Sequence, residues 1–250
     1  MKKDYLTIEW KACEESYAKE YSHSMIDTAE SFYGLFQQCR LRALLRESKG
    51  SVLDVGCADA PLIHWLAASG HFVVGVDVIV PSGMPKLKSQ NCNFICCVAE
   101  YLPFRNNSFD TVVLGEIIEH VVDPRRVFAE ACRVSNYKIL LTTPNTVSNP
   151  LAKCSPDHLR AFSYKTLFNF IKGFYVNIRL VKQPTLLPLP SLVQKVIYAW
   201  AKERYVLHKQ SFRRDTLVLR IMTEILKFLE EMSRFFPVLS ATLIVECRKV

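Results

Sequence analysis

The chain has 250 residues, of which 50% are hydrophobic and 22% are charged. This composition is typical of one globular domain and excludes a disordered or fibrous protein. No apolar run is long enough to span a bilayer, and the first residues lack the apolar core of a signal peptide, so a cytoplasmic protein is expected. The nine cysteines include no paired C-x-x-C spacing of a zinc site. Several of them (Cys96, Cys97, Cys247) lie in or beside apolar runs, which predicts reduced, buried thiols.

Positive charge is concentrated in the last hundred residues. Residues 151–250 carry 17 Lys and Arg against 7 Asp and Glu, so the overall charge of +8 leaves −2 on the first 150 residues. A basic region of this kind suits an anionic substrate, an acidic membrane surface or a nucleic acid, and it is equally consistent with a solvated face.

Strand-like and helix-like segments alternate along most of the chain. Strands are expected at residues 51–55, 72–78, 93–97, 109–114 and 137–143. Helices are expected at 61–70 and 124–134, each opened by a proline. A helix capped by Ser163, a strand near 174–182 and a final strand near 241–248 complete the series. The alternation predicts an α/β fold with a doubly wound, seven-stranded, mostly parallel sheet and helices on both faces.

Two segments lie outside this alternation, and they divide the single expected domain into parts. Residues 1–48 are expected to form a helical cover, 49–183 the core, 184–237 a helical insertion or lid, and 238–250 the final core strand. In the insertion, "TLVLRIMTEILKFLEEMSRFF" repeats apolar residues at three- and four-residue steps. Such a stripe most often packs on a core, less often covers a substrate, and least often lies on a membrane surface.

The turn after the first expected strand, "LDVGCADAP", has the features of a nucleotide-binding loop. Small residues at Gly56, Ala58 and Ala60 allow a ligand to approach the backbone, and a helix N-terminus follows. Asp77 ends the next strand, where nucleoside binders place a carboxylate on ribose hydroxyls. The candidate ligands are NAD and S-adenosylmethionine. The alanines, together with Asp54 two positions before Gly56, favour S-adenosylmethionine over a pyrophosphate.

Two carboxylates and an imidazole lie close together in "GEIIEHVVDP". Glu116, Glu119 and His120 are spaced i, i+3 and i+4, so one helical turn would place them on one face. The side chains are helix caps, or His120 is a general base, or the cluster binds a metal with His158 of "PDHLRAFSYKTL" as fourth ligand. Two carboxylates and two imidazoles suit magnesium, manganese or zinc and leave open positions for a vicinal diol. The base and the metal remain equal alternatives.

Five stretches together resemble the class I S-adenosylmethionine-dependent methyltransferases, in particular the small-molecule branch of ubiquinone and menaquinone biosynthesis. They are "VLDVGCADAPL", "VVGVDV", "AEYLPFRNNSFDTVV", "GEIIEHVVDP" and "ILLTTPN", within about residues 50 to 165. The resemblance implies a Rossmann-like core in which Asp54 orders the loop, Asp77 holds the ribose and Ala99 and Glu100 lie near adenine. The full set of implied cofactor-binding residues is Asp54, Gly56, Cys57, Ala58, Asp77, Val78, Ala99, Glu100 and Glu116.

The sequence departs from this family at a few positions. Ala58 and Ala60 stand where glycine is usual, and Val98 stands where many relatives have an aspartate. The acid and histidine cluster with its distant histidine is similar to two metal-using branches, the catechol-type O-methyltransferases of ubiquinone synthesis and the enzymes that methylate the terminal 2′-hydroxyl of small RNAs. That similarity implies Glu116, Glu119, His120 and His158 as metal ligands, with His120 and His158 as the catalytic pair.

The sequence therefore predicts a methyltransferase that acts on a hydroxyl oxygen of a small molecule. The apolar and basic content of the cover segments suggests a hydrophobic acceptor with an anionic group. RNA 2′-O-methylation is the rival activity, although the chain has no recognised RNA-binding module. The remaining alternative is a non-catalytic binding protein, which the Ala58, Ala60 and Val98 departures would favour. Peripheral membrane contact is left open.

Overall fold

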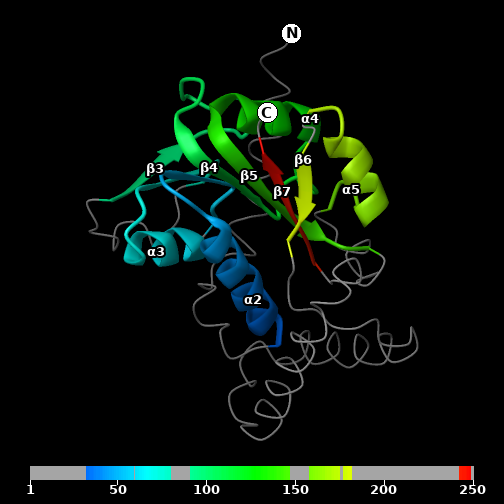
Figure 1. Ribbon diagram of the computed structural model, residues 1–250, viewed down its shortest axis with the longest axis horizontal. Coiled ribbons are helices and arrows are strands. Elements are labelled where there is room, and N and C mark those ends of the chain that lie inside the picture. Colours follow the sequence, from blue (N-terminus) through cyan, green and yellow to red (C-terminus); the bar gives the residue numbers. More distant parts are fainter. Residues whose placement is uncertain are drawn as a thin grey trace, which may run out of the picture.

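The fold is centred on one twisted sheet. The structure is a computed structural model that describes residues 32–58, 60–79, 91–146, 158–174, 177–181 and 242–248. Seven strands pair in the order β3-β2-β1-β4-β5-β7-β6 (Figure 1). Their bounds are β1 Val52–Val55, β2 Val73–Asp77, β3 Cys92–Cys96, β4 Phe109–Gly115, β5 Ser135–Pro144, β6 Asn177–Leu180 and β7 Thr242–Arg248. The first five are parallel, and β7 is antiparallel to both β5 and β6.

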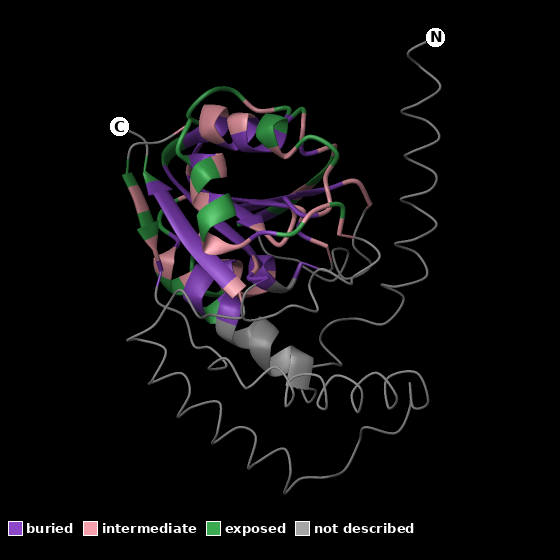
Figure 2. Ribbon diagram, turned by 90° about the vertical axis from the view of Figure 1, so that its right-hand side faces the viewer, coloured by how far each residue is buried: buried purple, intermediate pink, exposed green. Residues whose placement is uncertain are grey.

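Helices cover both faces of the sheet, as expected. The described helices are α2 Phe32–Glu47, α3 Pro61–Ala68, α4 Pro124–Val134 and α5 Tyr164–Ile171. Successive strand residues point to opposite faces. Val52 accordingly packs with the apolar side chains of α2 and α3, whereas Leu53 packs with those of α4 and α5. The central strands are buried on both faces (Figure 2). The doubly wound, mostly parallel architecture is therefore confirmed.

Local signals at the helix ends act as the sequence indicates. Asp123 caps α4 through a bond from the Arg126 N–H, and Pro124 occupies the first turn. Ser163 caps α5, where it forms a capping box with Thr166. Gly70, just beyond α3, has a φ of +86°, a conformation that glycine adopts without strain.

Residues 1–31 and 182–241, which hold most of the expected cover and insertion, lie outside the described residues, so the domain boundaries stay predictions. The prediction of buried thiols is wrong for Cys96, which is exposed because it ends the edge strand β3. The described cysteines are all free. Across the described ranges, no helix is both apolar and long enough to cross a membrane.

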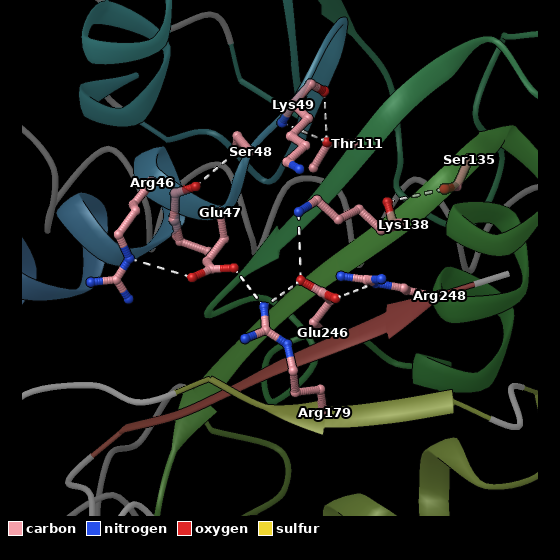
Figure 3. A network of polar contacts seen from close by, with 11 residues as sticks. Arg46, Glu47, Ser48, Lys49, Thr111, Ser135, Lys138, Arg179, Glu246 and Arg248 are labelled. Atoms are coloured by element: carbon pink, nitrogen blue, oxygen red, sulfur yellow. Dashed lines mark hydrogen bonds and ion pairs between the residues drawn. The ribbon is translucent and has the colours of Figure 1, made fainter. Parts of the chain in front are cut away.

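A charged network joins the end of α2 to the last strands (Figure 3). Glu246 of β7 is buried and forms ion pairs with Lys138 at 3.5 Å, Arg179 at 2.7 Å and Arg248 at 2.6 Å. Arg179 also pairs with Glu47 at 2.6 Å. Burial would raise the pKa of Glu246, but the two arginines outweigh it and lower that pKa to about 2. The network therefore fixes the C-terminal end of α2 against β6.

Candidate functional site

The candidate site lies where the parallel strands end. The carboxyl ends of β1, β2 and β4 meet at one edge of the sheet, and three loops continue from them at residues 56–60, 78–79 and 116–122. In open α/β sheets this edge is where ligands bind. Most of the candidate cofactor residues lie on these loops or at the strand ends that lead into them, and Ala99 and Glu100 follow β3.

The loop after β1 makes a tight left-handed turn. The φ angles of Gly56, Ala58 and Ala60 are +72°, +45° and +63°. Each alanine in this conformation costs about 1 kcal/mol relative to the glycine that the family resemblance leads one to expect there. The N–H groups of Gly56 and Cys57 both donate to the Val76 carbonyl, at 2.8 and 3.1 Å, and hold the loop against β2. The loop therefore keeps its tight turn despite the two alanines.

Asp77 at the end of β2 is the polar anchor of this loop. It is 8% exposed, and its Oδ2 accepts from the Ala58 N–H at 2.9 Å while Oδ1 accepts from the Ile79 N–H at 3.3 Å. The neighbouring Val78 is half-buried, and its carbonyl accepts from the Cys96 thiol at 3.3 Å. The carboxylate thus lies beside the expected cofactor loop, where a ribose-binding group is predicted.

The other implied cofactor positions follow β3. Ala99 is buried and packs in the main core, whereas Glu100 is half-buried. The Glu100 carbonyl accepts from Arg126 Nε at 3.2 Å, and the Arg126 guanidinium lies 5.2 Å from the centre of the Tyr101 ring. This stretch is therefore held to the start of α4.

A Gly56→Ala variant should be destabilised by more than its backbone conformation requires. An added Cβ would lie 2.6 Å from Ile117 Cδ1, so it would force that side chain to move. Gly70→Ala is the matched control, because its φ is also positive but no atom lies within 4 Å of the new Cβ. We expect the control to lose about 1–2 kcal/mol and Gly56→Ala about 1–3 kcal/mol more in urea unfolding. Equal losses of unfolding free energy in the two variants would show that the Ile117 side chain moves aside at no measurable cost.

Arg40 is a site residue that the sequence reasoning missed. It lies on α2, is 8% exposed, and its Nη1 is 3.5 Å from Thr142 Oγ1 and 3.0 Å from the Cβ position of Gly115. Its charge lowers the pKa values of Asp54, Glu116 and Glu119, though not enough to offset their burial. A signal was available, because Arg40 shares a helix face with the buried Leu44, four residues on.

The buried carboxyl group of Asp54 should make the stability of the ligand-free protein depend on pH. Burial, opposed by Arg40 and reinforced by Asp77, raises its pKa from 3.8 to about 7. The folded chain therefore holds this proton more tightly than the unfolded chain, and the resulting stability is lost as pH rises from about 4 to about 7. We expect the melting temperature to fall between about pH 5 and about pH 7.5, and less steeply in Asp54→Asn. An unchanged slope in Asp54→Asn would contradict the assignment.

The acidic segment after β4 is a turn and not the regular helical turn that its spacing suggested. Glu116 has a φ of +57°, which is uncommon for a residue with a side chain. Its N–H donates to the Thr142 carbonyl at 3.0 Å, and the His120 N–H donates to the Ile117 carbonyl at 2.9 Å. The expectation of one helical face is therefore wrong, although the turn still places Glu119 and His120 together.

Glu119, His120 and His158 come together as a potential ligand group. Their ligand atoms all lie within 4.8 Å of one another. The two imidazole rings meet edge to face, with centroids 4.8 Å apart. Glu116 lies outside this group but near it, since His158 lowers the pKa of Glu116 and the Glu116 charge raises that of Glu119.

The carboxylates of this cluster have unsatisfied oxygens. Both side-chain oxygens of Glu119 and Oε1 of Glu116 are buried without a hydrogen-bond partner, and so is the hydroxyl of Thr143. Burial, followed by the Glu116 charge, raises the pKa of Glu119 to about 8, against smaller opposing effects that include the charge of Arg40. The Thr143 hydroxyl lies near enough to Glu119 to lower that pKa as well, although the two side chains do not meet as a hydrogen bond. Buried carboxylate oxygens are normally paired or coordinate metals. The donor set therefore fits a divalent cation.

Comparison with known proteins identifies the central part of the chain. Residues 53–137 match the family described as "Methyltransferase domain". A demethylmenaquinone methyltransferase from Roseiflexus sp. (strain RS-1) is 33% identical over 93 residues, which are 35% of this chain and 39% of that protein. A ubiquinone biosynthesis O-methyltransferase from Coxiella burnetii is 36% identical over 81 residues, 30% of this chain and 35% of that protein. The chain thus matches only about two fifths of the length of these curated relatives.

A solved structure shares the fold over almost the whole chain. The 1,6-didemethyltoxoflavin-N1-methyltransferase of Burkholderia thailandensis, with S-adenosylhomocysteine bound, has a TM-score of 0.58 and 12% identity and covers 99% of this chain and 89% of that one. The resemblance inferred from the five motifs is confirmed by these matches. Residues 53–137 are therefore similar to the methyltransferase domain, and the fold is shared with a solved methyltransferase structure.

Proposed function

We propose that this chain transfers a methyl group from S-adenosylmethionine to a hydroxyl oxygen of a small-molecule acceptor. The observation that carries the proposal is the contact between the two parts of the site. Ile117 of the acidic turn lies against Gly56 of the loop after β1. A cofactor held on that loop would therefore have its reactive end beside Glu119, His120 and His158, and transfer depends mainly on such alignment.

The cofactor contacts follow from the chemistry of the loop residues. Each oxygen of Asp77 accepts one backbone N–H and has further acceptor capacity, which the two ribose hydroxyls would fill. The amino-acid end of the cofactor would lie against Gly56, Cys57 and Ala58. The buried Asp54, in the strand that leads into this loop, would help to order it. Val78, Ala99 and Glu100 would lie near the adenosine, with Glu116 at the reactive end.

Glu119, His120 and His158 would hold a magnesium, manganese or zinc ion, with Glu116 as a further ligand. The unsatisfied oxygens of Glu116 and Glu119 support this assignment. When bound, such an ion lowers the pKa of an acceptor hydroxyl. The chain's own residues orient that hydroxyl and exclude water from it. In the metal-free alternative, His120 takes the proton that the hydroxyl loses on attack.

The acceptor class is inferred from the relatives and the charge distribution. One curated relative is named a demethylmenaquinone methyltransferase, and the other is named a ubiquinone biosynthesis O-methyltransferase. A hydrophobic quinone precursor with an anionic group is consistent with the excess of basic residues in the last hundred positions. A cytoplasmic enzyme with peripheral membrane contact is part of the same proposal. RNA 2′-O-methylation would suit the same charge excess, and salt-sensitive RNA binding would favour it.

Calorimetric titration of the full chain with S-adenosylmethionine tests the proposal. We expect cofactor binding in chelator, followed by uptake of a catechol that requires added magnesium, manganese or zinc. Cofactor binding without any metal effect would remove the ion and leave His120 as the base. Failure to bind the cofactor would favour the non-catalytic binding protein.

A further inference from the structure

The acid and histidine cluster is assembled from two separate segments. Glu119 and His120 belong to the turn after β4, whereas His158 begins a described segment just before α5. The backbone N–H groups of Leu159 and Arg160 both donate to the Glu119 carbonyl, at 2.9 and 3.3 Å. The cluster therefore forms only when these two segments are docked on each other.

The Arg160 side chain reinforces this contact. Its Nη1 donates to the Val121 carbonyl and its Nη2 donates to the Val122 carbonyl at 2.9 Å. These carbonyls follow His120 directly in the chain. One guanidinium therefore binds the turn immediately after two of the proposed ligands, Glu119 and His120. Charge-assisted hydrogen bonds are stronger than neutral ones, and the rigid fork of arginine binds two acceptors in fixed geometry.

The far end of the same segment is anchored independently. Phe162 is buried and bridges to Asn145, and its carbonyl accepts from the N–H and the hydroxyl of Thr146, each at 2.9 Å. This anchor lies four residues from His158, so it fixes the far end of the segment separately from the contacts at residues 159 and 160. Next to His158, the two backbone bonds and the two Arg160 bonds join the segment to the turn, and the imidazole itself contacts the His120 ring.

We propose that Arg160 is the positioning residue that sets His158 against Glu119 and His120. This inference rests on the proposed function, because the geometry that Arg160 holds is that of the proposed metal site. Arg160 acts through the turn and not on the acceptor. A lysine at this position keeps the charge but lacks the fork, so it separates positioning from simple charge attraction.

The test compares Arg160→Met and Arg160→Lys with Arg42→Met, which removes an exposed arginine from α2. Manganese affinity is measured from the paramagnetic resonance of free Mn²⁺, without acceptor, on the full chain. Loss of a residue that orients metal ligands typically weakens binding about 10–100-fold, and we expect this loss in both Arg160 variants. S-adenosylhomocysteine affinity should be unchanged in all three variants, which verifies that each is folded. Arg42→Met should bind manganese as the wild type does.

A second readout needs no metal. Hydrogen exchange of the Leu159 N–H, which donates to the Glu119 carbonyl, should be about tenfold faster or more in both Arg160 variants. Unchanged exchange in a variant that still binds S-adenosylhomocysteine would overturn the proposal, as would wild-type behaviour of Arg160→Lys. If the wild type takes up no manganese, the metal part of the proposed function fails, while the exchange rates still decide the role of Arg160.

Discussion

An Asp77→Asn variant is expected to bind S-adenosylhomocysteine about 100-fold more weakly than the wild-type chain, or worse. The ribose hydroxyls would lose one of two hydrogen bonds to a carboxylate, at about 1.5–3 kcal/mol, and the remaining bond would lose its charge assistance. The new amide would also turn an N–H group toward a backbone donor, because both oxygens of Asp77 accept backbone N–H groups. Calorimetric titration measures the change directly.

Asp110→Asn is the matched control for this variant. Asp110 also accepts a backbone N–H, from Ser51 at 2.9 Å, but it lies at the amino end of β4, at the opposite edge of the sheet. Its loss should leave cofactor affinity unchanged. If Asp77→Asn bound the cofactor as tightly as Asp110→Asn does, Asp77 would be only a structural link between the loop and β2.

A His158→Ala variant should lose methyl transfer by about 1000-fold, the loss expected when a metal ligand is removed from an active site. The imidazole of His158 lies with Glu119 and His120 inside the 4.8 Å group, so its removal opens the proposed ion site. Cofactor affinity should not change, because Gly56 and Asp77 are untouched. The measurement is the methylation rate of a catechol at saturating cofactor and metal.

His71→Ala controls for the loss of an imidazole elsewhere. His71 contacts the Gly50 carbonyl at 2.9 Å and precedes β2, away from the carboxyl edge of the sheet. It should retain full activity. Should His158→Ala raise only the KM for the acceptor while kcat is kept, the ion would not be required, and His120 would be the remaining candidate base.

Most of the fold was predictable because its signals are local. Apolar runs indicated the buried strands, and the strand expected at 109–114 is observed as Phe109–Gly115. Prolines and Ser163 indicated the starts of helices. The strand expected at 137–143 is observed as Ser135–Pro144, because β5 begins directly after α4 with no loop between them. The cofactor loop was found because its residues are consecutive and its spacing to Asp77 is characteristic.

The rest of the site depends on contacts that no local pattern encodes. Arg40 reaches Thr142 from a helix that precedes the sheet, and although its spacing to Leu44 indicates burial, that spacing does not indicate a partner 102 residues away. The spacing of Glu116, Glu119 and His120 fits a helical turn as well as the observed turn, and nothing in the residue type of Glu116 predicts its positive φ. The sequence therefore indicated three side chains that come together, Glu119, His120 and His158, but not the backbone turn that positions two of them.

The pairing of β6 with β7 has a consequence for how this chain can vary. The Val181 N–H donates to the Ile244 carbonyl at 2.8 Å, so the chain leaves the sheet after β6 and rejoins it at an adjacent point. Arg179 and Glu246 lock the two strands just inside that junction. The connection between β6 and β7 therefore begins and ends at neighbouring points of the sheet, and closing a longer or shorter connection at such a junction costs little extra entropy. Its length can change between relatives while β6 and β7 keep their pairing.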